Sequence, residues 1–123
     1  MDELAANEEL GVRFVAAMTG GDKEALQDIF DENAVIWHPT DMKEKNAHAS
    51  FDGLTTFFRE RSISYQDIRR SAFPGGFVQQ HVVTAPKDNG EVFQMPVCIV
   101  AAVKGGRIVR IDEYYDSARR AQL

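Results

Sequence analysis

The sequence predicts an α+β fold in which a largely antiparallel sheet bends around helices from the first half of the chain. Up to about residue 61, apolar residues mostly recur every three or four positions, the period of a helix with one buried face. From residue 65 onward, four long runs rich in Val, Ile, Phe and Tyr are separated by short glycine-containing segments, as in strands joined by hairpins. Helices that precede a run of strands pack as a layer against the sheet.

Two antiparallel helices are expected at the start of the chain. The first has an apolar stripe made of Leu10, Phe14, Val15 and Met18. It is expected to end at Gly20-Gly21, because glycine is the usual residue just beyond a helix. Asp22 is the expected N-cap of the second helix. The apolar stripe of that helix is made of Ala25, Leu26, Ile29 and Phe30.

A short strand and a third helix complete the first half. Residues 34–38 form a short apolar run that stops at Pro39, which cannot continue a sheet ladder. Residues 40–50 show no period and are expected to form a mobile loop, with His48 in solvent. A third helix is expected from about Asp52 to Arg61, with a buried face made of Leu54, Phe57 and Phe58.

The second half is predicted to be a meander of four strands. Their expected ranges are Tyr65–Phe73, Phe77–Ala85, Glu91–Val103 and Arg107–Tyr115. Hairpin-type segments that contain glycine separate them, at residues 74–76, 86–90 and 104–106. The chain contains no repeat and no internal linker, which indicates a single domain over residues 1–123.

Composition and charge exclude several classes of protein. A length of 123 residues with 44% hydrophobic and 27% charged residues is ordinary for one globular domain. The formal charge of −5 argues against a nucleic-acid or anionic-membrane partner, because both are held mainly by Lys and Arg. The acidic N-terminus is unlike a signal peptide and no apolar run approaches membrane length, so a cytoplasmic protein is expected.

Cysteine and motif content point away from metal and nucleotide chemistry. The single Cys98 excludes an intramolecular disulfide and a multi-cysteine zinc site, and is expected to be a small buried hydrophobe. No His-x-x-x-His spacing, phosphate-binding loop, dinucleotide glycine pattern or serine elbow is present. We therefore expect neither a metal nor a cofactor.

The last expected strand carries the most informative side chains. Strand alternation places on one face Val109, Ile111, Glu113 and Tyr115. It places on the opposite, outer face Ile108, Arg110, Asp112, Tyr114 and Asp116. Val109 and Ile111 are apolar and are expected to face the interior, so Glu113 on the same face is expected to point inward too. An unpaired carboxylate is costly to bury there. Glu113 is therefore a candidate for chemistry, and a cross-strand ion pair with Arg69 or Arg70 is the structural alternative.

Two histidines are further candidates. His38 ends the short strand beside Pro39. It is either a general acid or base near neutral pH, or a structural residue that caps a loop carbonyl through a hydrogen bond. His81 lies in the middle of a strand beside glutamines that blur the pattern, so either face remains open. Facing inward, it is expected to hydrogen-bond a neighbouring carboxylate.

Three motifs, in this order and spacing, resemble those of a known superfamily. They are Phe14–Met18 with Gly21-Asp22, Trp37-His38-Pro39, and Gly105–Ile108 leading to Glu113–Asp116. The arrangement is similar to the SnoaL-like group of the nuclear transport factor 2-like superfamily, whose members include relatives of ketosteroid isomerase and limonene epoxide hydrolase. The resemblance covers nearly the whole chain. It implies a cone-shaped, mixed but largely antiparallel sheet wrapped around three N-terminal helices.

The resemblance matches the catalytic residues of the family only in part. His38 stands at the position of the isomerase general base, Phe14 at its oxyanion-hole tyrosine, and Cys98 near its protonated aspartate. Against limonene epoxide hydrolase, Glu113 matches one pocket aspartate and His81 stands at the arginine. The resemblance implies a pocket but no single reaction, because the fold hosts isomerases, hydrolases, cyclases and non-catalytic adaptors.

We expect a mostly apolar pocket whose acid–base residues are His38, Glu113 and His81. Its expected substrate-binding residues are Phe14, Trp37, Phe57, Phe58, Met95, Cys98, Val100, Ile111 and Tyr115. Two functions remain open: a cofactor-free isomerase, cyclase or hydrolase acting on a small apolar molecule, or a non-catalytic binding or assembly module. A homodimer is expected through the outer sheet face, which would otherwise expose Val and Ile side chains.

Overall fold

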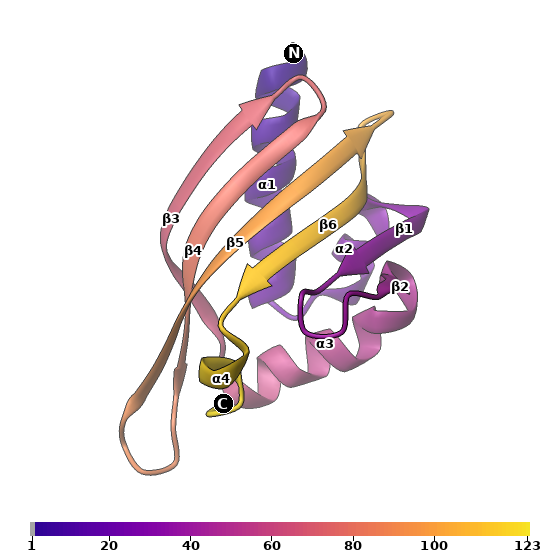
Figure 1. Ribbon diagram of the computed structural model, residues 1–123. Coiled ribbons are helices and arrows are strands. Elements are labelled where there is room, and N and C mark those ends of the chain that lie inside the picture. Colours follow the sequence, from indigo (N-terminus) through magenta and orange to yellow (C-terminus); the bar gives the residue numbers. More distant parts are fainter. Residues whose placement is uncertain (1) are drawn as a thin grey trace.

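The computed structural model describes residues 2–123 and contains one curved sheet packed against N-terminal helices (Figure 1). The helices are α1 (Glu3–Thr19), α2 (Lys23–Ile29), α3 (Ala47–Arg61) and the short α4 (Ser117–Arg120). The strands are β1 (Phe30–Trp37), β2 (Glu44–Asn46), β3 (Ser64–Phe73), β4 (Gly76–Pro86), β5 (Val92–Lys104) and β6 (Arg107–Tyr115). The predicted α+β class is confirmed.

The six strands form one mixed sheet in the order β2-β1-β6-β5-β4-β3. Strands β3 to β6 form the predicted antiparallel meander, and β1 pairs with β2 antiparallel. The exception is β1 with β6, which run parallel and bring Trp37 opposite Asp112. In Figure 1, α1 runs behind the long strands while α3 crosses below them, so the helices and the concave side of the sheet enclose the core.

Side-chain caps explain where the helices begin. Asp22 accepts a hydrogen bond from the N–H of Ala25 at 3.0 Å, which confirms its predicted N-cap role. Helix α3 starts at residue 47 rather than at about residue 52, because Asn46 caps it by accepting from the N–H of Ala49 at 2.9 Å. The expected mobile loop is therefore shorter, and part of it is β2. No helix formed by residues 2–123 is long and apolar enough to cross a membrane.

A bulge in β6 corrects the predicted face of Ile108. Ala102 of β5 pairs with Arg110 and the next residue, Val103, pairs with Ile108, so Val109 is an extra residue in β6. The extra residue reverses the alternation before it, and Ile108 is fully buried instead of lying on the outer face. After the bulge the predicted alternation holds, and Ile111 is buried.

The two faces of the sheet differ in environment. The inward face of β4 carries Phe77, Gln79, His81, Val83 and Ala85, all buried. The inward face of β5 carries Phe93, Met95, Val97, Ile99 and Ala101, also buried. The sequence did not decide which face of the sheet His81 occupies. In the structure it is the inner face, and only 2% of the residue is exposed. We call the opposite face of β1, β6, β5 and β4 the outer sheet face; it carries Trp37, Val78, Val82, Cys98, Val100 and Tyr114.

Candidate functional site

A pocket of about 400 Å³ lies between the helices and the concave side of the sheet. Helices α1 and α3 supply its apolar wall, which includes Phe14, Met18, Phe51, Leu54, Phe57 and Phe58. The sheet supplies Val83, Met95, Ile111 and Tyr115. The volume falls in the range of ordinary small-molecule sites. The expected apolar cavity is therefore present in the structure.

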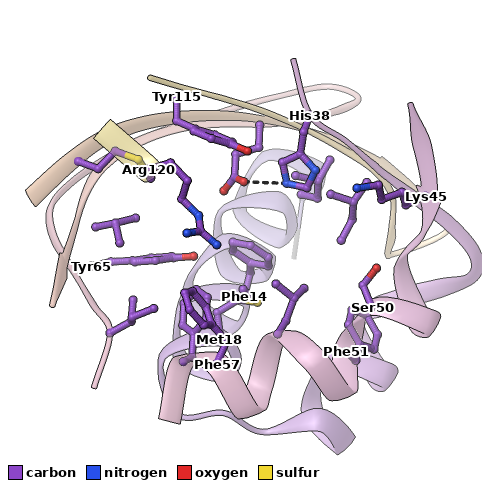
Figure 2. Close-up of a pocket in the computed structure, with 18 of the residues that line it drawn as sticks. Phe14, Met18, His38, Lys45, Ser50, Phe51, Phe57, Tyr65, Tyr115 and Arg120 are labelled. Carbon is purple, nitrogen blue, oxygen red and sulfur yellow. Dashed lines mark hydrogen bonds and ion pairs between the residues drawn. The ribbon is translucent and has the colours of Figure 1, made fainter. Parts of the chain in front are cut away.

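His38 and Glu113 meet inside this pocket. The Nε2 atom of His38 lies 3.0 Å from the Oε1 atom of Glu113, and each side chain is about a quarter exposed, at 25% and 26% (Figure 2). The parallel register of β1 and β6 explains the contact, because it sets Trp37 opposite Asp112 and so places the next residues of both strands side by side. The ring of His38 also packs edge-on against Tyr115, with centroids 5.9 Å apart.

The geometry of this pair assigns a role to each nitrogen of His38. An ionised Glu113 accepts hydrogen bonds only, so a neutral His38 donates its Nε2–H to it. The lone pair is then on Nδ1, which is free to take a proton from a ligand or a water molecule. The alternative of a cross-strand ion pair between Glu113 and Arg69 or Arg70 is wrong, because Glu113 pairs with His38, and Arg70 pairs with Glu8 at 2.8 Å.

His81 belongs to a buried polar chain beneath the pocket. Arg70 donates from Nε to the Oε1 atom of Gln79 at 2.9 Å and from Nη1 to Glu8 at 2.8 Å. Because the Gln79 oxygen accepts, its amide nitrogen is the donor to His81 Nδ1, at 2.9 Å. The proton of a neutral His81 is therefore on Nε2, a buried atom with no hydrogen-bond partner among residues 2–123. His81 thus bonds an amide and not the expected carboxylate.

The environment of His81 keeps it neutral. Burial is the main cause that lowers the pKa of His81 from 6.5 to about 4; the charge of Glu113 opposes the shift and that of Arg70 adds to it. The imidazole does not itself line the pocket, because the ring of Tyr65 lies flat against it with centroids 3.9 Å apart. Any influence of His81 on a ligand therefore passes through Tyr65 or requires that ring to move.

Tyr65 is a polar pocket residue that sequence reasoning missed. It lines the pocket, and its hydroxyl points inward (Figure 2). Burial, followed by the charge of Glu113, raises the pKa of Tyr65 well above 10, so the phenol stays protonated as a donor. A bulge between Gln66 and Arg69 hides this from the sequence, because it turns both Tyr65 and Arg70 toward the interior.

A comparison with protein-family models identifies the family of the chain. The family model described as SnoaL-like domain matches residues 12–111. The chain belongs to the SnoaL-like domain family. A comparison with curated proteins found no match.

Solved structures with similar folds agree with the SnoaL-like assignment. A putative polyketide cyclase from Xanthomonas campestris pv. campestris has a TM-score of 0.82 at 18% identity, covering 97% of this chain and 96% of that one. An LEH-like epoxide hydrolase from M. tuberculosis has a TM-score of 0.77 at 16% identity, covering 98% and 90%. A protein of ketosteroid isomerase-like fold from Catenulispora acidiphila, solved with trimethylamine, has a TM-score of 0.73 at 14% identity, covering 88% and 85%. At these identities the likeness shows the fold.

Three expected pocket residues of the SnoaL-like domain lie elsewhere. Trp37 packs against Tyr114 on the outer sheet face, with ring centroids 5.5 Å apart. Cys98 is half-buried and Val100 is 37% exposed on the same face, because each alternates with buried neighbours on β5. None of the three lines the pocket. The expected residues that do line it are Phe14, His38, Phe57, Phe58, Met95, Ile111, Glu113 and Tyr115.

His48 is held in place rather than being solvated in a loop. It lies in the first turn of α3, and its Nε2 atom is 3.0 Å from the carbonyl oxygen of Asp31 and 3.3 Å from that of Phe30. It therefore ties α3 to the start of β1. Within residues 2–123, no group of three or more His, Cys, Asp or Glu side chains is arranged to hold a metal ion.

Proposed function

We propose that this SnoaL-like protein is a cofactor-free enzyme that isomerises, cyclises or hydrolyses a small apolar molecule by acid–base chemistry. The observation that carries the proposal is the 3.0 Å contact between His38 and Glu113 in a largely apolar pocket. Two ionisable groups held together beside a ligand space are the arrangement that general acid–base catalysis requires.

In the proposed mechanism, His38 is the base and Glu113 supports it. Nδ1 of His38 takes a proton from the substrate, or from a water molecule that then attacks it. The imidazolium that forms is stabilised by the Glu113 carboxylate, which already accepts the Nε2 proton. The proton returns from Nδ1 to another atom of the substrate or to a leaving oxygen, so the pair ends the cycle unchanged.

A turnover screen with matched variants tests this. Ketones, epoxides and polyketide-like aromatics are incubated with the wild-type protein and with His38→Ala and Glu113→Gln. Loss of a general base or its partner typically lowers a rate roughly 100- to 10,000-fold. Asp112→Asn is the control for Glu113→Gln, because Asp112 is the preceding residue and pairs with Arg110 at 2.8 Å outside the pocket. Near-full turnover in His38→Ala or in Glu113→Gln removes that residue from the mechanism.

The alternative is a non-catalytic binding or assembly module. It is favoured by one observation: apart from His38, Lys45, Glu113 and Arg120, the pocket carries no charged side chain, and apolar residues dominate its lining. A protein that binds an apolar ligand and turns over nothing in the same screen fits this alternative. Under either function we propose a homodimer formed through the outer sheet face and a cytoplasmic location.

A further inference from the structure

Among the described residues, one cationic side chain that lines the pocket has no ion-pair partner. The pocket lining includes one histidine, one carboxylate and two cationic side chains, namely His38, Glu113, Lys45 and Arg120. His38 pairs with Glu113 at 3.0 Å, and Lys45 pairs with Asp41 at 3.1 Å. Arg120 has no carboxylate within ion-pair distance among residues 2–123. The protein as a whole carries −5, so this local excess of positive charge is a feature of the pocket.

Aromatic contact holds the Arg120 guanidinium at the pocket. Helix α4 follows the end of β6 and lies beside α3 in Figure 1, and the Arg120 guanidinium stands 4.9 Å from the centre of the Phe57 ring. Both residues line the pocket, and the side chain of Arg120 points into it in Figure 2. A guanidinium that stacks on an aromatic face keeps its N–H groups free in the plane of the fork, ready for a ligand.

A second donor faces the same space. The Tyr65 hydroxyl points into the pocket (Figure 2). Its ring is fixed by the stack on His81 and an edge contact with Phe58, at centroid distances of 3.9 and 5.9 Å. A phenol held rigid in this way is a preorganised hydrogen-bond donor. Tyr65 and Arg120 therefore both offer hydrogen-bond donors to this space, while the Glu113 carboxylate that also lines the pocket is already bonded to His38.

We infer that the ligand of this pocket is an apolar carboxylic acid, bound as its anion, with the carboxylate held by Arg120 and Tyr65. A carboxylate accepts two parallel N–H bonds from a guanidinium and a further one from a hydroxyl, which matches this donor set. The apolar body of the acid then occupies the space between α1, α3 and the sheet, and reaches toward the His38–Glu113 pair. This inference names the substrate class of the proposed enzyme and rests on that function for its catalytic meaning, although binding itself requires no turnover.

The test compares two ligands of nearly the same shape, 2-naphthoate and 2-naphthamide, by isothermal titration near neutral pH. The wild-type protein is expected to bind the acid roughly 10- to 100-fold more tightly than the amide, the size of one charge-assisted hydrogen bond. Arg120→Gln is expected to abolish this preference, and Tyr65→Phe is expected to reduce it. Arg120→Lys keeps the charge and is expected to retain a part of it.

Arg119→Gln is the matched control. Arg119 lies on the same short helix but is exposed, and it donates to the carbonyl oxygen of Gln94 at 3.1 Å outside the pocket. Its variant is expected to keep the full preference for the acid. If Arg120→Gln weakens both ligands equally, Arg120 only fastens α4 to α3 and the inference is wrong. Equal binding of the two ligands by the wild-type protein, or binding of neither at millimolar concentration, also overturns it.

The outcome separates this inference from the proposed enzyme. A preference for 2-naphthoate that survives in His38→Ala and Glu113→Gln supports the carboxylate site even if no substrate is ever turned over. Turnover of neutral substrates that is lost in those two variants, but unaffected in Arg120→Gln, supports the acid–base pair and contradicts the carboxylate site.

Discussion

The phenol ring of Tyr65 lies almost parallel to the imidazole of His81, with 3.9 Å between ring centroids and 15° between the planes. The stack joins a pocket residue to the end of the polar chain Glu8–Arg70–Gln79–His81, which is buried except at Glu8, so polar contacts connect the pocket wall at Tyr65 to α1. A buried polar chain of this kind is stabilising only while every link is made. Stability should therefore respond strongly to changes in this chain and weakly to changes in the His38–Glu113 pair.

His81 should make folding stability depend on pH. Its pKa is about 4 in the folded protein against an ordinary value of 6.5, so between these values the unfolded chain binds a proton there and the folded protein does not. Stability is therefore fully present above about pH 6.5 and is lost as the pH falls toward 4, by roughly 3 kcal/mol in total. Urea unfolding of the wild-type protein and His81→Gln at about pH 5 and about pH 7 measures this contribution. An identical pH dependence in both proteins would rule it out.

Gln79→Leu should destabilise the protein by about 2 to 4 kcal/mol, because it leaves Nε of Arg70 and Nδ1 of His81 without partners in the interior. Gln80→Leu is the matched control, since Gln80 is the next residue of β4 but exposed on the outer side, and its variant should stay within about 0.5 kcal/mol of the wild type. Chemical denaturation of the two variants gives both free energies of unfolding. Equal effects would mean that the buried amide is not a structural link.

Glu113→Gln should leave the free energy of unfolding within about 1 kcal/mol of the wild-type value, because its ion pair with His38 is about a quarter exposed and solvent weakens it. The amide also retains an oxygen that accepts from His38. Thermal or urea unfolding checks this beside the turnover assay. A loss several times larger would identify the pair as a structural ion pair and would weaken its assignment as acid–base machinery.

The proposed homodimer should depend on the outer sheet face. Val100 and Tyr114 are 37% and 46% exposed there, and a charge introduced between two packed sheets is costly. Val100→Lys should convert the dimer to a monomer, whereas Val12→Lys, at a 54% exposed position on α1, should not. Light scattering at micromolar concentration measures the mass. A monomeric wild-type protein would contradict the proposal.

Features that depend on local chemistry were predictable from the sequence. The Asp22 cap follows from one side chain and the backbone three residues later. The inward faces of β4 and β5 were not predicted in the same way: the sequence left the face of His81 open, and it placed Cys98 and Val100 in the pocket although they lie on the outer sheet face. Glu113 was found because it continues the inward-facing apolar pattern of its strand, and His38 because it ends a strand beside Pro39, where the resembled family keeps its general base.

Features that depend on an irregularity were not predictable. The bulge in β6 reverses the face of Ile108, and the bulge in β3, where Asp67 has a φ of 53°, turns Tyr65 and Arg70 to the same side. Neither bulge contains a glycine or another clear sequence signal. Side-chain alternation counted across a bulge therefore assigns the residues beyond it to the wrong face of the sheet. Arg120 was missed because α4 is a single turn, too short to give a helical period, that is held by contacts with residues distant in the sequence such as Phe57 and Gln94.

The parallel pairing of β1 and β6 has a consequence for how the protein assembles. Along the chain the sheet is two separate pieces, the β1–β2 hairpin and the β3–β6 meander, and in the order β2-β1-β6-β5-β4-β3 a single seam joins them. His38 and Glu113, 75 residues apart, lie at the end of that seam. Contacts of such long range close a large loop and are slow to form. The acid–base pair therefore exists only once both pieces have docked, and a local opening of the seam would switch it off while leaving each piece intact.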